Sequence, residues 1–228
     1  MQYHIQTTPI WEAFRSDCAC PVCALYERTQ ARIVTQYGNE AVMEPAARVR
    51  VNKRGFCTKH LKMLYEGENK LGLALQVHTR SQAIAAGLKK PSDGKAAAKE
   101  AARIESELET CVICDTVDEL MIRYAYTIAQ MFIHEPEFPA LFAASRGFCL
   151  KHYALLLENA HKAGRNAPAF LSELYRVQHD SMNEICASLE GFTNQYDYRS
   201  ARATAGARDA LPRAIEKLKG PILDRNKK

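Results

Sequence analysis

One pattern of cysteine and histidine residues occurs twice in this chain, and it constrains the fold more than any other feature. The first copy is the CxxC pair Cys20-Pro-Val-Cys23, followed by the segment Arg54-Gly-Phe-Cys-Thr-Lys-His60. The second copy is Cys111-Val-Ile-Cys114, followed by Arg146-Gly-Phe-Cys-Leu-Lys-His152. The copies are 91 residues apart in the CxxC pair and 92 apart in the second segment. Such constant spacing indicates an internal duplication.

Each copy supplies three thiols and one imidazole, the donor set that suits tetrahedral zinc. Four protein ligands leave no open position for water or substrate, so we expect two structural Zn²⁺ sites, each closed within its own repeat. An iron–sulfur cluster is the alternative for the same donors, although the closely spaced cysteine runs typical of such clusters are missing. The predicted metal ligands are Cys20, Cys23, Cys57, His60, Cys111, Cys114, Cys149 and His152.

The residues that precede the second ligand pair are predicted to support the metal. Gly55 and Gly147 can adopt backbone conformations closed to other residues and leave room for amide groups to point at sulfur. Arg54 and Arg146 could offset the negative charge of the thiolates, or they could be solvated charges at a helix end. Both interpretations of the arginines stay open.

Two further cysteines lie outside the repeated pattern. Cys186 lies in an amphipathic stretch and is expected to be a small buried apolar residue. Cys18, two residues before Cys20, is expected to be a bystander, with an extra ligand or a resolving thiol as the alternatives. No secretory signal or membrane span is evident, so we expect a cytoplasmic protein in which disulfides would be rare.

The hydrophobic periodicity is helical almost throughout, and strand-like alternation is hard to find. The sequence therefore predicts an all-α fold, with duplicated helical units that are each clipped by a Cys3His site and followed by a basic C-terminal tail. The predicted helices cover about residues 20–36, a short segment from Pro45, 57–66, 71–88, about 111–134, 139–144, 149–163 and 169–189. The predicted divisions are a first repeat at 10–90, a linker and lead-in helix at 91–110, a second repeat at 111–191 and a basic, mobile tail with one short helix at 192–228.

The net charge of +5 is concentrated at the C-terminus. Residues 199–228 hold nine Lys/Arg and three acids, so the rest of the chain carries about −1. This tail could make weak, non-specific contacts with nucleic acid phosphates.

The chain lacks the common catalytic motifs. It has no phosphate-binding glycine loop, no GxSxG and no HExxH, and no strand–helix–strand pattern surrounds the CxxC pairs. We therefore predict no catalytic residue and do not expect an enzyme.

The combined motifs resemble an uncharacterised bacterial protein family, mostly cytosolic and of unknown function. The resemblance rests on both CxxC and RGFCxxH segments and on Asn69-Lys-Leu-Gly-Leu-Ala74, and it covers about residues 10–190. Val112 stands where the family has a proline, a change expected to leave ligation intact. The resemblance implies metal binding and brings no known activity.

Three functional classes follow from the sequence. The first is a zinc-stabilised helical scaffold or regulatory protein that binds another protein, because closed metal sites and absent catalytic groups point there. The second is a nucleic-acid binder that uses residues 199–228. The third is a thiol-based redox sensor or iron–sulfur protein.

Overall fold

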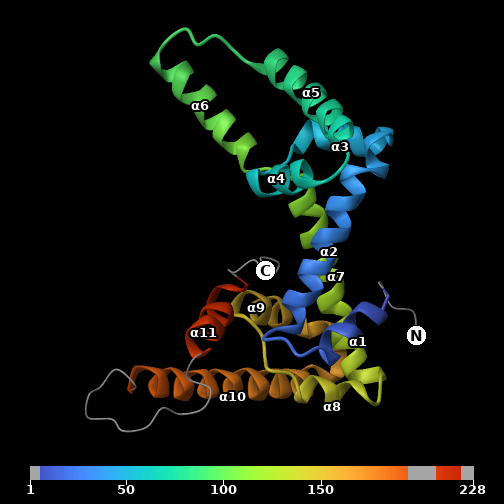
Figure 1. Cartoon of the computed structure of the whole chain (residues 1–228), viewed down its shortest axis with the longest axis vertical. Helices are drawn as coiled ribbons and strands as arrows, with labels where there is room; N and C mark the ends of the chain where they lie inside the picture. The colour runs from blue at the N-terminus through green and yellow to red at the C-terminus, as the bar shows by residue number, and fades with distance from the viewer. Residues whose placement is uncertain (1–5, 195–208, 222–228) are drawn as a thin grey trace. The chain divides into compact units, whose positions relative to one another are not determined.

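The computed structural model describes residues 6–194 and 209–221, which are helical with no strand among them (Figure 1). The predicted all-α class is confirmed. No helix in this part of the chain combines the length and apolar character needed to cross a membrane. The helices are α1 (Thr8–Arg15), α2 (Pro21–Gly38), η1 (Glu40–Val42), α3 (Pro45–Arg54), α4 (Thr58–Glu66), α5 (Lys70–Gly87), α6 (Gly94–Leu108), α7 (Val112–His134), α8 (Phe138–Ala143), α9 (Leu150–Asn159), η2 (Ala160–Asn166), α10 (Ala167–Asn194) and α11 (Ala210–Lys219).

The order of helices repeats, as the duplicated motif predicts. A long helix, a short helix, a helix headed by the CxxH pair and another long helix follow one another as α2 to α5 and again as α7 to α10. The lead-in helix expected in 91–110 is α6. Helix α1 was not predicted, although Ile10, Ala13 and Phe14 have helical spacing and form its buried face.

Local residue chemistry sets several helix ends. Pro45 opens α3, where its missing N–H costs no hydrogen bond. The Asn69 side chain caps α5 by accepting from the Gly72 amide at 2.8 Å, and Asp93 caps α6 by accepting from Ala96 at 2.8 Å. The backbone therefore starts these helices where the sequence places its capping residues.

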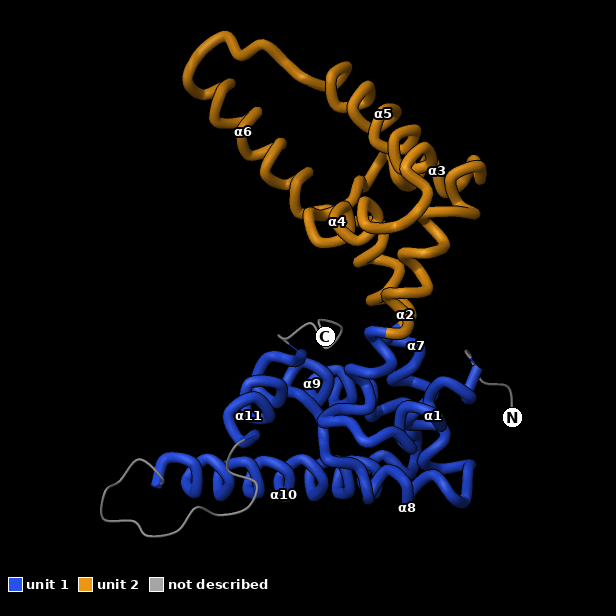
Figure 2. The backbone as a smooth tube through the Cα atoms, in the orientation of Figure 1, with its two compact units in different colours: residues 1–27, 121–228 blue, residues 28–120 orange. Residues whose placement is uncertain are grey.

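The chain forms two compact units, coloured separately in Figure 2. Unit 1 comprises residues 1–27 and 121–228, and unit 2 comprises residues 28–120. Helices α2 and α7 each begin in one unit and end in the other. Each unit therefore contains sequence from both repeats, while the repeat boundaries at 10–90 and 111–191 stay a prediction.

The core of unit 1 is a cluster of phenylalanines. Phe138, Phe142, Phe148 and Phe170 are completely buried, and the ring centroids of Phe142 lie 5.4 Å from Phe148 and 5.6 Å from Phe170. These are favourable separations for aromatic pairs. Because Phe148 directly precedes Cys149, the core fixes the segment that carries the second ligand pair.

Unit 2 has a smaller core. Val51, Leu64 and Leu73 are buried, and the rings of Tyr37 and Phe56 meet edge to face at 6.1 Å. Helix α6 buries no residue. Much of the apolar surface of α5 and α6 therefore remains exposed.

Part of the predicted basic tail forms a packed helix. Helix α11 packs against α9 and α10 within unit 1 and buries Ala210, Ala214 and Lys217 (Figure 1). Residues 195–208 and 222–228 of the predicted tail lie outside the described residues.

Candidate metal centres

The structure brings the eight predicted ligand residues together in two clusters. Each cluster has three cysteines and one histidine, whose sulfur and ring-nitrogen atoms all lie within 4.8 Å of one another. The cluster in unit 1, named site A, consists of Cys20, Cys23, Cys149 and His152. The cluster in unit 2, named site B, consists of Cys57, His60, Cys111 and Cys114.

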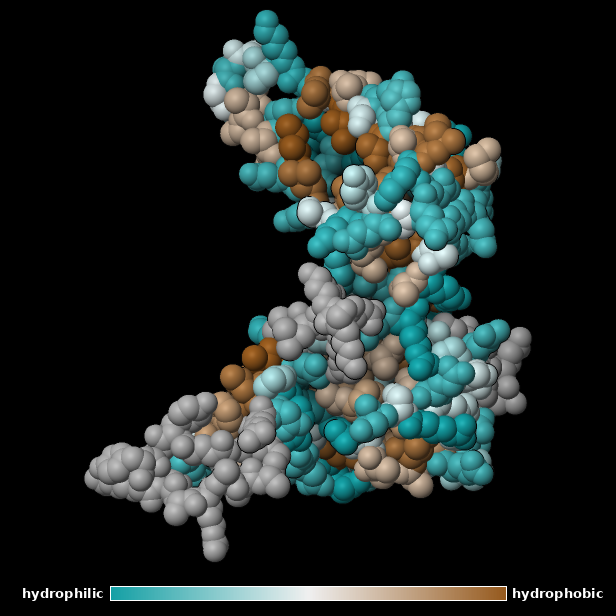
Figure 3. Space-filling view, viewed as in Figure 1, coloured by the Kyte–Doolittle hydropathy of each residue, from teal (hydrophilic) through white to brown (hydrophobic). Residues whose placement is uncertain are grey.

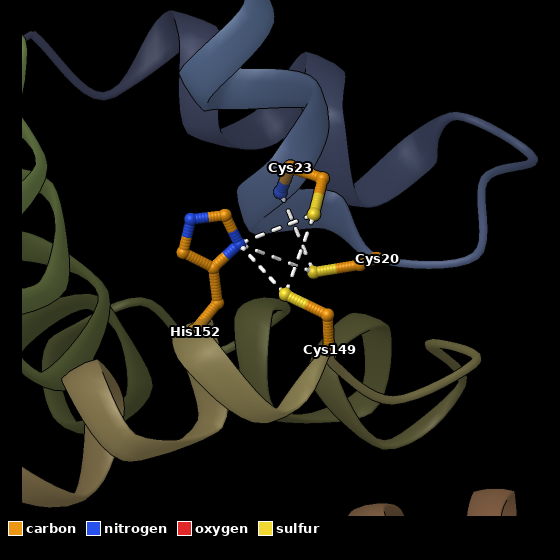
Figure 4. Close-up of side chains that lie close together, drawn as sticks. All are labelled: Cys20, Cys23, Cys149 and His152. Atoms are coloured by element: carbon orange, nitrogen blue, oxygen red, sulfur yellow. Dashed lines mark hydrogen bonds between the residues drawn. The ribbon is translucent and has the colours of Figure 1, made fainter. Parts of the chain in front are cut away.

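In site A the three sulfurs and one ring nitrogen converge on a common point (Figure 4). Nδ1 of His152 lies 3.7 Å from Cys20 Sγ, 3.2 Å from Cys23 Sγ and 3.3 Å from Cys149 Sγ. The sulfurs of Cys23 and Cys149 are 3.5 Å apart. All four residues are buried.

Site B repeats this geometry. Nδ1 of His60 lies 3.3 Å from both Cys57 Sγ and Cys111 Sγ and 3.4 Å from Cys114 Sγ. The sulfurs of Cys57 and Cys114 are 3.9 Å apart. Cys111 and His60 are buried, whereas Cys57 and Cys114 are partly exposed. Site B is therefore the more accessible cluster.

The distances fit a single tetrahedral ion. Zn–S bonds of about 2.3 Å and Zn–N bonds of about 2.0–2.1 Å at tetrahedral angles give S···S and S···N separations of roughly 3.8 Å and 3.6 Å. The separations in both sites fall close to these values. They far exceed the bond length of about 2.05 Å in a disulfide. The cysteines of both sites are free thiols and could hold metal.

Helix starts position the ligands. Cys57 and Cys149 are the N-cap residues of α4 and α9, so the histidine three residues later lies in the first turn on the same side. In the CxxC pairs, the amide of Cys23 approaches Cys20 Sγ at 3.4 Å and that of Cys114 approaches Cys111 Sγ at 3.5 Å. Such amides stabilise negative charge on sulfur.

The thiols of site A share charge unequally. Hydrogen bonds from Cys20 and Cys23 hold the pKa of Cys149 far below its usual range. Burial raises the pKa of Cys20 to about 12, and the hydrogen bond to Cys149 raises that of Cys23. The metal-free cluster therefore favours one thiolate, at Cys149, stabilised by two thiol donors.

In site B, the pKa values of Cys57 and Cys114 are shifted in opposite directions. Burial acts to raise the pKa of Cys57, but hydrogen bonds from the His60 amide and the other thiols outweigh it and lower this pKa. Burial and the Cys111 charge raise the pKa of Cys114 to about 12. Burial also lowers the pKa of His60 to about 4, so its imidazole is neutral, the form that binds metal, at physiological pH.

The expectation that each site closes within its own repeat is wrong. Site A joins the CxxC of the first repeat to the CxxH of the second, and site B joins Cys111 and Cys114 to Cys57 and His60. The physical reason is the length of the helix that follows each CxxC. With a rise of 1.5 Å per residue, the 18 residues of α2 span about 27 Å. Cys20 and Cys23 at the start of α2 therefore belong to unit 1, and the first repeat continues in unit 2 from the end of this helix.

The arginines beside the ligands connect the two halves of each site, and the glycines have positive φ angles. Arg54 pairs with Asp115, which follows the CxxC of site B, through contacts of 2.7 and 2.9 Å. Arg146 pairs with Asp17, close before the CxxC of site A, at 2.7 Å. Gly55 and Gly147 adopt φ angles of 62° and 77°, a region that favours glycine.

The two remaining cysteines lie outside both clusters. Cys18 Sγ contacts the Ala13 carbonyl at 3.8 Å and accepts from Ser16 Oγ at 3.3 Å, which fits the bystander interpretation. Cys186 is exposed, so its expected burial is wrong. It lies beside the buried Ile185 on the outward side of α10.

Sequence reasoning missed one residue close to site A. Lys217 is only 3% exposed, and its ammonium donates to the carbonyls of Ala19, at 2.7 Å, and Arg146. Burial lowers its pKa, while the nearby thiolates of site A act to raise it. The sequence did contain one indication that Lys217 is buried. It lies at helical spacing from Ala210 and Ala214, the other buried residues of α11.

Comparison with known proteins agrees with the motifs. Residues 1–225 match a family of unknown function, DUF6062. The chain belongs to this family. The resemblance to an uncharacterised family is thereby confirmed, and the match to DUF6062 extends beyond the predicted range of 10–190. Neither a curated protein nor a solved structure matches the chain. Comparison with relatives therefore assigns no activity to this member of DUF6062.

Proposed function

We propose that this protein binds two structural Zn²⁺ ions, one in each cluster, and serves as a helical scaffold for another protein. The observation that carries the zinc proposal is the convergence of four nitrogen and sulfur donors within 4.8 Å in each site. Zinc favours such closed tetrahedral sets in structural sites. The thiolates of an iron–sulfur cluster sit on different irons, whereas these donors surround one point.

The test of metal identity is elemental analysis and a visible spectrum of the anaerobically purified full chain. About two zinc per chain and a colourless solution are expected, because Zn²⁺ has a filled d shell. A brown protein that contains iron would replace the zinc proposal with the iron–sulfur alternative. Purification without added metal guards against loading from the buffers.

Exposed apolar side chains on unit 2 support a protein partner. Leu71 and Leu88 at the ends of the α5 segment are 72% and 57% exposed, and Leu108 at the end of α6 is 73% exposed. Figure 3 shows apolar residues gathered on this part of unit 2. Val77 and Ile84, seven residues apart on α5, are also exposed, so exposed apolar side chains run along the length of this helix. Exposed apolar surface of this kind commonly marks an interaction site. We therefore assign the partner-binding role to α5 and α6.

Cross-linking in cell extract, analysed by mass spectrometry, tests this assignment. The exposed lysines in and between α5 and α6 should cross-link to one recurrent partner, and the exposed lysines of unit 1 should not. Leu88→Glu and Leu108→Glu should abolish those cross-links, whereas Leu157→Glu on α9 of unit 1 should retain them. Equal cross-linking by all three variants would refute the assignment. The test lysines are Lys89, Lys90, Lys95 and Lys99, and the reference lysines are Lys151 and Lys162.

The nucleic-acid alternative gains no support from the described part of the tail. Of the three basic residues in this part, Lys217 is buried, Arg213 pairs with Glu184 at 2.6 Å and with Asp209 at 3.3 Å, and Lys219 alone is exposed. Charges engaged in this way add little to phosphate binding. Residues 199–208 and 222–228 of the predicted nucleic-acid segment lie outside the described residues.

A further inference from the structure

The two sites differ in how their ligand-bearing segments are joined. In site B, the Val112 amide, between the two cysteines of the CxxC, donates to the Gly55 carbonyl at 3.0 Å. The Thr110 hydroxyl, just before the CxxC, shares its one hydrogen between the carbonyls of Arg54 and Glu107. Two hydrogen bonds from the CxxC segment therefore reach the segment that leads to Cys57.

Neither hydrogen bond can form in site A. Pro21 occupies the position of Val112 and has no N–H to donate, and Ala19 occupies the position of Thr110 and has no hydroxyl. The ion pair between Arg146 and Asp17 does cross between the segments, but its side chains are 56% and 79% exposed. Exposed pairs of this kind stabilise weakly. Site A thus lacks the internal connections that site B has.

Lys217 of α11 occupies the place of the missing connections. Its ammonium donates to the Ala19 carbonyl at 2.7 Å and also to the Arg146 carbonyl, the counterpart of the Arg54 carbonyl in site B. Gly147 permits this approach, because a Cβ there would lie 3.3 Å from Lys217 Nζ and 2.8 Å from Ser181 Cβ. One side chain therefore bridges the two ligand segments from outside.

We propose that Lys217 is a positioning residue of site A, so that docking of α11 and metal binding at site A stabilise each other. This inference rests on the proposed metal function. Besides the two hydrogen bonds, the ammonium supplies a positive charge beside the metal site. Three thiolates and one bound Zn²⁺ give that site a net charge of −1, which the ammonium offsets. Burying a lysine is costly without such compensation. Coupling of this kind is reciprocal: if bound metal stabilises the docked position of α11, then docking of α11 raises the affinity of site A for the metal by the same factor.

The experiment compares zinc release from the full-length wild type and variants, using a chromogenic chelator in excess. Lys217→Met keeps the length of the side chain but removes the donor and the charge. Lys219→Met is the matched control on the same helix, because Lys219 is exposed. Ala19→Thr added to Lys217→Met tests rescue, because a threonine there could donate to the Arg146 carbonyl as Thr110 does to that of Arg54.

Lys217→Met should speed the release of one zinc by about tenfold or more, the effect typical of residues that orient metal ligands. The other zinc, held in site B, should leave at the wild-type rate and so report that the protein is folded. Ala19→Thr should slow the accelerated release. Hydrogen exchange across residues 209–221 should increase when the chelator removes zinc from the wild type.

Release of both zincs at the wild-type rate from Lys217→Met would overturn the inference while leaving the two-zinc proposal intact. Failure of Ala19→Thr to slow release would overturn the bridging role of Lys217. Unchanged exchange in α11 after zinc removal would overturn the coupling. A wild-type chain that binds no metal would overturn the proposed function itself, and with it the inference.

Discussion

Paired removal of ligands distinguishes closure across the repeats from closure within them. We consider three double variants that each remove two thiols. Cys23→Ala with Cys149→Ala removes both from site A, where the two sulfurs are 3.5 Å apart. Cys57→Ala with Cys114→Ala removes both from site B, at 3.9 Å. Cys23→Ala with Cys57→Ala removes one from each site, although both belong to the first repeat.

The structure predicts different zinc contents for these variants. The two same-site variants should each keep about one zinc, because the other four-ligand site is untouched. The same-repeat variant should keep almost none after a chelator challenge, because both sites have lost a ligand. Structural zinc contributes roughly 10–16 kcal/mol apparent in small domains, comparable with the whole stability of a typical domain. The unit that loses its zinc should therefore unfold at much lower denaturant concentration.

The assay is elemental analysis of desalted protein, with denaturant unfolding monitored by circular dichroism. The reverse pattern, in which Cys23→Ala with Cys57→Ala keeps one zinc and both same-site variants lose two, would refute closure across repeats. Equal zinc contents in all three variants would refute the assignment of these cysteines as ligands.

Three further outcomes follow from the described side chains. Phe142→Ala should destabilise unit 1 by about 3–5 kcal/mol, measured by denaturant unfolding, because it removes a fully buried ring from the aromatic cluster. Mild peroxide should release zinc from site B before site A, followed with a chromogenic chelator, because Cys57 and Cys114 are partly exposed; simultaneous release would contradict this order. Hydrogen bonds from Arg103 lower the pKa of Glu100 to about 2, so their stabilising effect on α6 should be full above pH 4.5 and disappear as the pH falls through 2, as a carboxyl NMR titration would record.

The helix order and the donor set could be predicted from sequence because both depend on local patterns. Helical periodicity, capping residues such as Asn69 and the CxxC and CxxH spacings all act within a few residues. They predicted most of the described helices, and the eight cysteine and histidine residues that they single out meet in the two clusters. Helix α1 escaped notice because it is short, and its buried Phe14 contacts partners far along the sequence, including Phe138 at 5.0 Å.

The pairing of the clusters could not be predicted from those local patterns. Spacing within a repeat is the same whether a CxxC meets the CxxH of its own repeat or that of the other. The pairing of each CxxC with a CxxH depends on where the ends of the long helices lie. Helices α2 and α7 each begin at one cluster and end in the other unit. Lys217 was missed for a related reason, because lysine is almost never fully buried and its partners lie 198 and 71 residues away.

The difference between Val112 and Pro21 links the sequence of each CxxC to the way its site is supported. The replacement of proline by valine looked neutral, since neither side chain is a ligand. In the folded chain, the valine contributes an amide that donates to the Gly55 carbonyl, and the proline leaves site A without that bond. Ala19 removes a second bond, so the Lys217 ammonium from α11 supplies the bridge between the two ligand segments of site A. If this reasoning is correct, Pro21→Val combined with Ala19→Thr should make zinc binding at site A far less sensitive to Lys217→Met.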